Sequence, residues 1–185
     1  MIKSDIRKSF KELRNKMSAE DVSRLSFSAA KRFISSDIYK NAKTIMLYWP
    51  LGNETDTRTV LEQIFKDGKT AVLPVTDPNT DDIIPVIMQE NSEMKTGAYR
   101  IAEPKDAPTI NKEDIDVVIV PGIVFDLTGA RIGFGKGCYD RFLKDTKAKK
   151  VGYCYACQIT DKIMSDEFDI CMDYLITDKE MVFCE

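Results

Sequence analysis

The sequence predicts an α/β protein: a single domain in which a mostly parallel sheet carries helices on both faces. Segments with the apolar pattern of strands alternate along the chain with segments of helical period. Residues 116–121 form a nearly continuous β-branched run, which is typical of a strand covered on both faces. The length of 185 residues suits one domain, residues 1–185, with a sizeable buried core.

Two helices are expected before the first strand. Residues 2–17 repeat apolar side chains at spacings of three and four, and Ser18 with Asp21 forms a weak capping pattern for a second helix. The expected inward positions are Ile2, Ile6, Phe10, Leu13 and Met17 in the first helix and Val22, Leu25, Ala29 and Phe33 in the second. By default, Lys3, Arg7 and Lys8 would form a solvated face.

The rest of the chain alternates. Strands are expected at residues 44–49, 70–74, 83–88, 116–121, 149–155 and 174–177, and helices at residues 57–65 and 137–147. Polar loops are expected at residues 76–82 and 103–108. In a mostly parallel sheet, ligands bind beyond the carboxyl ends of the strands.

The segment after the strand at 116–121 has the composition of a phosphate-binding loop. Glycines let the backbone turn its N–H groups toward a ligand, a following helix adds partial positive charge, and cations neutralise phosphate. A closing carboxylate can hold a metal on phosphate oxygens. The segment supplies all of these in Arg131, Gly133, Gly135, Lys136, Gly137, Tyr139 and Asp140. The sequence therefore predicts a nucleotide-using enzyme, with a plain glycine-rich turn as the simpler alternative.

Two commoner phosphate loops do not fit. A Walker A loop needs glycine five residues before Gly135 and serine or threonine after Lys136, but Ala130 and Gly137 occupy those places. The dinucleotide pattern needs a third glycine where Cys138 stands.

Composition narrows the chemistry. The chain contains no histidine, so Ser-His and Cys-His nucleophile pairs are excluded, and phosphoryl transfer by positioning and charge neutralisation suits the remaining side chains. A net charge of −3 argues against a general nucleic-acid surface. We also expect no membrane segment and no signal peptide.

The five cysteines predict free thiols in a reducing cytoplasm. Cys154 and Cys157 form a C-x-x-C pair, but Cys154 lies in an apolar run and no histidine is present. We therefore favour buried structural thiols over a redox or zinc site.

The long motif resembles the signature of the 5-formyltetrahydrofolate cyclo-ligase family, also called 5,10-methenyltetrahydrofolate synthetases. The matching residues are Pro121, Gly122, Phe125, Asp126, Gly129, Arg131, Ile132, Gly133, Gly135, Gly137, Tyr139 and Asp140. Weaker matches follow the family's order over nearly the whole chain. They are Lys3 with Arg7, Trp49, Asn53 to Thr57, Lys95 to Gly97, Glu103 with Pro104, Gln158, Asp169, Asp173, and Ile176 with Thr177.

The resemblance implies an enzyme that converts 5-formyltetrahydrofolate and ATP to 5,10-methenyltetrahydrofolate, ADP and phosphate, with magnesium. The formyl oxygen attacks the γ-phosphate, N10 then attacks the activated carbon, and phosphate leaves. This chemistry needs positioning, charge neutralisation and exclusion of water, and no protein nucleophile.

The resemblance also implies roles for individual residues. Arg131, Lys136 and Tyr139 would be catalytic. ATP would be bound by Lys3, Ser4, Asp5, Ile6, Arg7, Arg131, Ile132, Gly133, Phe134, Gly135, Lys136, Gly137, Cys138 and Tyr139. The folate would contact Trp49, Glu54, Phe134, Gly135, Lys136, Gly137 and Cys138, and magnesium would be held by Asp140 and Asp169. The resemblance therefore implies that Lys3 and Arg7 bind ATP and are not part of a solvated face. Trp49 either lines the pterin pocket or only packs in the core.

Two positions depart from the family pattern. Cys138 replaces the first tyrosine of a Tyr-Tyr pair, which puts one pterin contact in doubt. Phe168 precedes Asp169 where a histidine is common, which leaves Asp173 as an alternative metal ligand.

Two other functions remain open at this stage. The same cradle could serve another ATP-dependent small-molecule kinase or ligase, or a non-catalytic ATP-binding module. Glu54 and Trp49 argue against another kinase or ligase, because a substrate without a pterin would not require them. Folate-dependent turnover would distinguish an enzyme from a non-catalytic ATP-binding module. A monomer is the simpler expectation for the oligomeric state.

Overall fold

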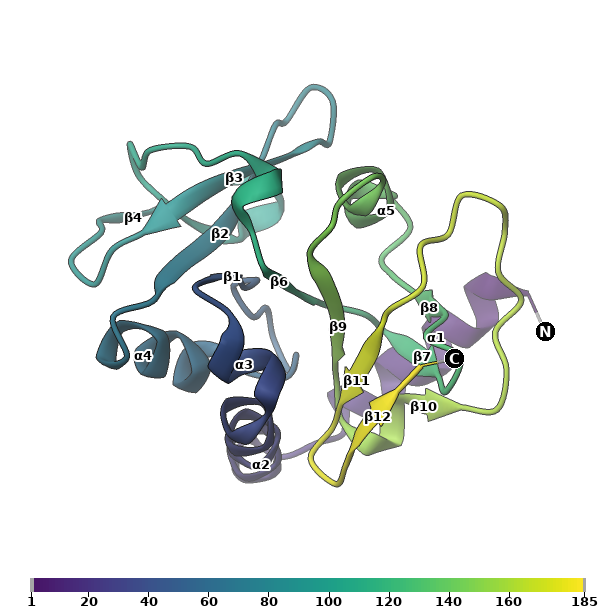
Figure 1. Ribbon diagram of the computed structural model, residues 1–185. Helices are drawn as coiled ribbons and strands as arrows, with labels where there is room; N and C mark the ends of the chain where they lie inside the picture. The colour runs from purple at the N-terminus through teal and green to yellow at the C-terminus, as the bar shows by residue number, and fades with distance from the viewer. Residues whose placement is uncertain (1, 185) are drawn as a thin grey trace.

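The computed structural model describes residues 2–184 and is built around one seven-stranded sheet (Figure 1). In spatial order the strands are β12 (Met181–Phe183), β11 (Tyr174–Ile176), β9 (Lys149–Tyr153), β6 (Val117–Val120), β1 (Thr44–Met46), β2 (Thr70–Thr76) and β3 (Ile83–Met88). The five inner strands, from β11 to β2, are mutually parallel, and β12 and β3 add an antiparallel strand at each edge. The predicted mostly parallel sheet is therefore confirmed.

Side chains of the sheet alternate between two apolar cores. Val117 and Ile119 of β6 face a core shared with α2 (Ala19–Ser35), α3 (Asp37–Asn41) and α4 (Arg58–Lys66). Val118 and Val120 face the opposite core, which contains Phe142 and Leu143 of α5 (Cys138–Leu143). All four residues of β6 are buried, as the β-branched run predicts for a strand covered on both faces.

A second, three-stranded sheet carries the predicted phosphate loop. Its order is β10 (Ile159–Thr160), β7 (Val124–Asp126) and β8 (Arg131–Ile132), with β7 parallel to β10 and antiparallel to β8. Ile6 and Phe10 of α1 (Lys3–Asn15) pack against its apolar residues, so the N-terminal helix lies beside β7 and β8 (Figure 1).

Smaller elements complete the chain. A two-stranded sheet pairs β4 (Met94–Thr96) with β5 (Ala102–Pro104), and 3₁₀ turns form at Ala98–Arg100, Lys112–Asp114 and Ala156–Gln158. No helix among residues 2–184 has both the length and the apolar character needed to span a lipid bilayer.

Several elements differ from their predicted bounds. The loop expected at residues 103–108 begins inside β5, and the short strands β4, β5, β7, β8, β10 and β12 were not predicted. Consequently the phosphate loop follows the β7–β8 hairpin and does not follow β6 directly. The helix predicted for residues 137–147 ends at Leu143, because Lys144 takes an extended ψ of 130° and Asp145 a positive φ of 62°.

Three burial expectations are wrong. Ile2 and Leu13 are 70% and 43% exposed, while Arg14 is the buried residue of α1. Cys157 is exposed although Cys154 is buried. The expectation of free thiols holds, since all five cysteines are unpaired.

The predicted Ser18 cap of α2 is confirmed, because the Ser18 side chain accepts a hydrogen bond from the Asp21 N–H.

A buried carboxylate fixes the hairpin that leads into the phosphate loop. Asp126 is fully buried, and its Oδ1 accepts hydrogen bonds from the Thr128 N–H (3.0 Å), the Thr128 hydroxyl (2.7 Å) and the Ala130 N–H (3.1 Å). Its Oδ2 accepts from the Ile163 N–H at 2.7 Å. One side chain thus closes the β7–β8 turn and ties it to the segment after β10.

We expect Asp126→Asn to lower the free energy of unfolding by about 2–4 kcal/mol, because an amide group would turn a donor toward N–H donors in a buried site. Urea denaturation monitored by circular dichroism measures this. Asp161→Asn, at an exposed position of the same region, is the matched control and should stay within about 0.5 kcal/mol of wild type. Equal stability of the two variants would contradict the role given to Asp126.

Candidate functional site

A cavity of about 970 Å³ opens beyond the carboxyl ends of the central strands. Trp49 follows β1, Thr76 ends β2 and Pro121 follows β6, and all three line the cavity. This is the edge at which ligands of parallel sheets bind. The predicted site residues that also line it are Lys3, Arg7, Glu54, Arg131, Ile132, Gly133, Phe134, Gly135, Lys136, Gly137, Cys138, Tyr139, Asp140 and Asp169.

The glycine loop forms one wall of the cavity. Gly135 and Gly137 have φ values of 98° and 67°, which side chains rarely adopt, and Gly137 caps α5. The Nε of Arg7 donates a hydrogen bond to the Gly133 carbonyl at 2.9 Å, so α1 supports the loop from the side. The loop thereby brings glycines and the cations Arg131 and Lys136 to the same cavity, a composition that suits a phosphate ligand.

Two cations of the loop differ in their surroundings. Arg131 is buried, and its Nη2 donates to Asp140 Oδ1 at 2.9 Å while its Nε has no hydrogen-bond partner. Lys136 is more exposed and pairs with Asp81 at 3.4 Å. The Lys136 ammonium also lies 5.6 Å from the ring centroid of Tyr99. An unpartnered guanidinium N–H on a residue that lines the cavity suits an anionic ligand.

Asp140 and Asp169, the two predicted metal ligands, line the cavity together. Asp140 accepts from Arg131 and from the Ile170 N–H at 3.2 Å. Asp169 accepts from the Lys3 ammonium at 2.7 Å and from the Asp166 N–H at 2.8 Å. Burial raises the pKa of Asp169, but the bonds from Lys3 and the Asp166 N–H outweigh it, so the pKa is lowered and the carboxylate stays ionised.

This donor set fits magnesium held jointly with a nucleotide. Within residues 2–184, no three His, Cys, Asp or Glu side chains gather closely enough to hold a metal by themselves. Magnesium commonly takes only one or two carboxylates and completes its shell with phosphate oxygens and water. Asp173, the alternative ligand, instead bonds the Lys150 N–H at 2.7 Å and the Lys150 ammonium at 3.0 Å, and it does not line the cavity.

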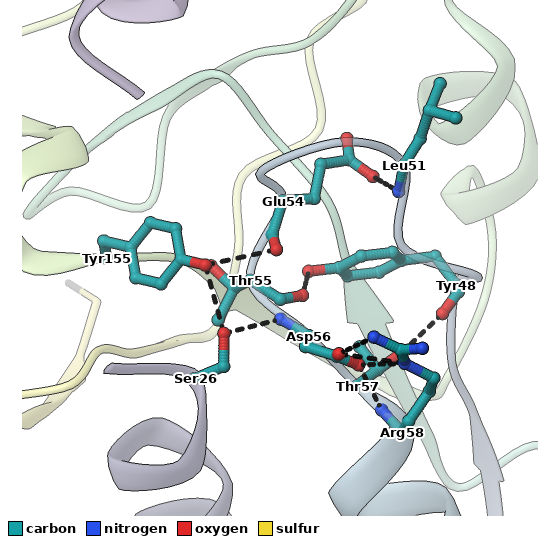
Figure 2. A network of polar contacts seen from close by, with 9 residues as sticks. All are labelled: Ser26, Tyr48, Leu51, Glu54, Thr55, Asp56, Thr57, Arg58 and Tyr155. Carbon is teal, nitrogen blue, oxygen red and sulfur yellow. Dashed lines mark hydrogen bonds and ion pairs between the residues drawn. The ribbon is translucent and has the colours of Figure 1, made fainter. Parts of the chain in front are cut away.

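Glu54 also lines the cavity and lies on a loop held by a polar network (Figure 2). The Tyr155 hydroxyl donates to the Glu54 carbonyl at 3.1 Å and contacts the Ser26 hydroxyl at 3.0 Å. Ser26 in turn accepts from the Asp56 N–H at 2.9 Å. The Glu54 carboxylate accepts from the Leu51 N–H at 2.9 Å.

Burial dominates the electrostatics near Glu54. It raises the pKa of the Glu54 carboxyl, although the Leu51 N–H and Arg14 lower it in part. Burial also raises the pKa of the Tyr139 phenol, which is therefore neutral, and its hydroxyl has no hydrogen-bond partner. The Glu54 carboxylate therefore offers this part of the cavity an acceptor, and the neutral Tyr139 side chain lines the same cavity.

Some predicted residues lie elsewhere or have a second role. Ser4 and Asp5 are exposed, Ile6 packs in the core beneath α1, and none of the three lines the cavity. Trp49 both lines the cavity and packs against the core of α2–α4. Cys138 is half-buried at the start of α5.

The sequence did not predict that the β2–β3 loop and the segment after β4 contribute residues to the cavity and its surroundings. Tyr99 and Arg141 line the cavity, and Arg141 Nε bonds Asp82 Oδ1 at 2.9 Å. Tyr99 donates its hydroxyl to Asp81. Asp81 and Asp82 lie in the β2–β3 loop, Tyr99 in a 3₁₀ turn and Arg141 in α5, so no local pattern indicates that they meet.

Comparisons with known proteins identify the family of the chain. The sequence model of the 5-formyltetrahydrofolate cyclo-ligase family matches residues 1–178. The chain is 29% identical over 175 residues to the 5-formyltetrahydrofolate cyclo-ligase of Escherichia coli (strain K12), covering 90% of this chain and 95% of that protein. It is 27% identical over 188 residues to that of Mus musculus, covering 94% and 92%.

Solved structures show the same arrangement. The NMR structure of 5,10-methenyltetrahydrofolate synthetase from Aquifex aeolicus is similar with a TM-score of 0.89 and 36% identity, covering 99% of this chain and 93% of that one. The enzyme of the same name from Mycoplasma pneumoniae is similar with a TM-score of 0.79 and 26% identity, covering 96% and 99%. The chain belongs to the 5-formyltetrahydrofolate cyclo-ligase family.

Proposed function

We propose that this enzyme converts 5-formyltetrahydrofolate to 5,10-methenyltetrahydrofolate with ATP and magnesium. One observation carries the proposal: a single cavity is lined by the phosphate-type loop, by Asp140 and Asp169, and by Glu54 and Tyr139. The reactants proposed here, a triphosphate and a pterin, need both kinds of group. We place the reaction in the reducing cytoplasm, where unpaired thiols are stable. We also propose that the enzyme acts as a monomer.

The phosphate end would bind ATP through cations and backbone donors. Arg131 and Lys136 would neutralise the β- and γ-phosphates, and the N–H groups around Gly135 and Gly137 would donate to their oxygens. Lys3 and Arg7 would extend this positive wall from α1. Asp140 and Asp169 would hold magnesium, which supplies charge neutralisation on the phosphate oxygens.

The opposite end would orient the folate. The Glu54 carboxylate suits the amino-pyrimidine edge of a pterin, which presents N–H donors side by side. The neutral Tyr139 phenol would donate to a carbonyl oxygen, and Trp49 would cover a face of the ring. These contacts would align the formyl oxygen with the γ-phosphate bound at the glycine loop.

The reaction then requires little covalent help from the protein. The formyl oxygen attacks the γ-phosphate and ADP departs. N10 attacks the activated carbon, the phosphate leaves with the proton that N10 loses, and the ring closes. The residues bind, align and shield the reactants, and the absence of a histidine base from the sequence is compatible with that role.

The first test is absorbance in the methenyl-folate band with purified protein, 5-formyltetrahydrofolate, magnesium and ATP. We expect the band to grow only when all three are present. Glu54→Gln should lower kcat/KM for the folate by at least about a hundredfold, because an amide cannot accept both pterin N–H groups. Glu62→Gln, at an exposed position on α4, is the matched control and should match wild type. ATP binding without growth of the band would refute the proposed reaction.

Asp140→Asn should raise the magnesium concentration needed for half-maximal velocity by about tenfold or more, because one metal ligand loses its charge. A magnesium titration at saturating ATP and folate measures this. Asp145→Asn serves as the control, since Asp145 is exposed, lies outside the cavity lining and has a positive φ that asparagine tolerates. An unchanged magnesium dependence in Asp140→Asn would remove Asp140 from the metal site.

A further inference from the structure

Arg14 of α1 is a buried cation without a role in the site described so far. It is 7% exposed and is the buried residue of a helix whose other charged side chains reach solvent or the cavity. Its Nη1 lies 4.0 Å from Glu54 Oε1, and its Nε has no hydrogen-bond partner. A buried cation is costly unless a partner compensates for its lost hydration, so this placement needs a reason.

The surroundings hold Arg14 against the Glu54 loop. The side-chain amide of Asn53 donates to the Arg14 and Met17 carbonyls, both at 3.2 Å, which joins the end of α1 to the residue before Glu54. The Arg14 guanidinium carbon also lies 6.0 Å from the ring centroid of Phe134 in the glycine loop. Arg14 does not line the cavity, so it acts on a ligand only through its neighbours.

We propose that Arg14 is a positioning residue that keeps the Glu54 carboxylate ionised and directed into the cavity for folate binding. The inference rests on the proposed function. It predicts that the ion pair between Arg14 of α1 and Glu54 sets the affinity for folate and does not affect the binding of ATP. Lys3 and Arg7 on the same helix face the phosphate end, so one helix would serve both ends of the cavity through different residues.

The groups around Glu54 determine how folate binding should depend on pH. Arg14 faces it from α1, Tyr48 from the end of β1 and Tyr139 from α5, while the Leu51 N–H comes from its own loop. Both tyrosines are neutral because burial raises their pKa values. Burial raises the pKa of Glu54, and the Leu51 N–H and Arg14 oppose it. Loss of Arg14 would therefore raise the pKa of Glu54 further and weaken folate binding as pH falls.

The test compares Arg14→Gln with wild type across pH, using the methenyl-band assay. We expect KM for 5-formyltetrahydrofolate to rise on the order of tenfold near about pH 6 and to return within about twofold of wild type near about pH 9. KM for ATP should stay within about twofold throughout. Arg14→Lys, which keeps the charge, should recover most of the folate affinity at the lower pH.

Lys8→Gln is the matched control, because it removes one cation from an exposed position on the same helix. Its pH profile should overlay that of wild type. If Arg14→Gln is unfolded by circular dichroism, Arg14→Met, which keeps an unbranched apolar stem, takes its place.

A folded, active variant whose folate KM follows wild type at every pH would overturn the inference while leaving the proposed function intact. An equal rise in KM for ATP, or no recovery at high pH, would overturn it as well, because either result indicates a general structural role. Failure of the wild-type enzyme to form the methenyl band would instead refute the proposed function.

Discussion

The buried carboxylate of Asp126 organises both halves of the phosphate end. Its Oδ1 closes the β7–β8 turn, and β8 delivers Arg131 and the glycine loop to the cavity. Its Oδ2 holds the Ile163 N–H, at the start of the segment that carries Asp169. A loop rich in glycine has no intrinsic preference for one shape, so its position must be imposed from its base. Four donors converging on one buried carboxylate supply that constraint.

The N-terminal helix links the two ends of the cavity. Lys3 pairs with Asp169, Arg7 bonds the Gly133 carbonyl and Arg14 faces Glu54, at spacings that keep all three toward the protein. The helix therefore packs partly through cations against carboxylates and carbonyls, while Ile2 and Leu13 remain exposed. The inward face of this helix therefore combines the apolar Ile6 and Phe10 with cations, whereas an ordinary amphipathic helix buries an apolar stripe. Under the proposed function, these cations would face the anionic ligand in the cavity.

The sequence predicted the central sheet well because its strands are covered on both faces, so continuous apolar runs such as Val117–Val120 are diagnostic. The glycine loop was equally visible, since few other structures need its combination of residues. The short strands β7 and β8 escaped prediction because a polar turn at Asp126–Ala130 interrupts them and their pairing is fixed by a buried carboxylate. The burial of Arg14 was not predicted, because lysine and arginine side chains on a helix are usually exposed to solvent. Only the tertiary contact with Glu54 distinguishes Arg14 from the other cations of the helix. Glu54 itself was located by family resemblance, as no local pattern marks it.

The pairing of Lys136 with Asp81 bears on how the enzyme discriminates among anions. A phosphate group that binds Lys136 has to displace a carboxylate already in place, so the free energy released is the difference between two ion pairs. A singly charged anion gains little from that exchange, whereas a triphosphate that engages several donors at once gains more. Under the proposed function, the Asp81 carboxylate would act as a threshold for anions that bind Lys136. In a cell crowded with small inorganic and organic anions, it would leave the loop available to the ligand that can replace Asp81 and contact Arg131 together.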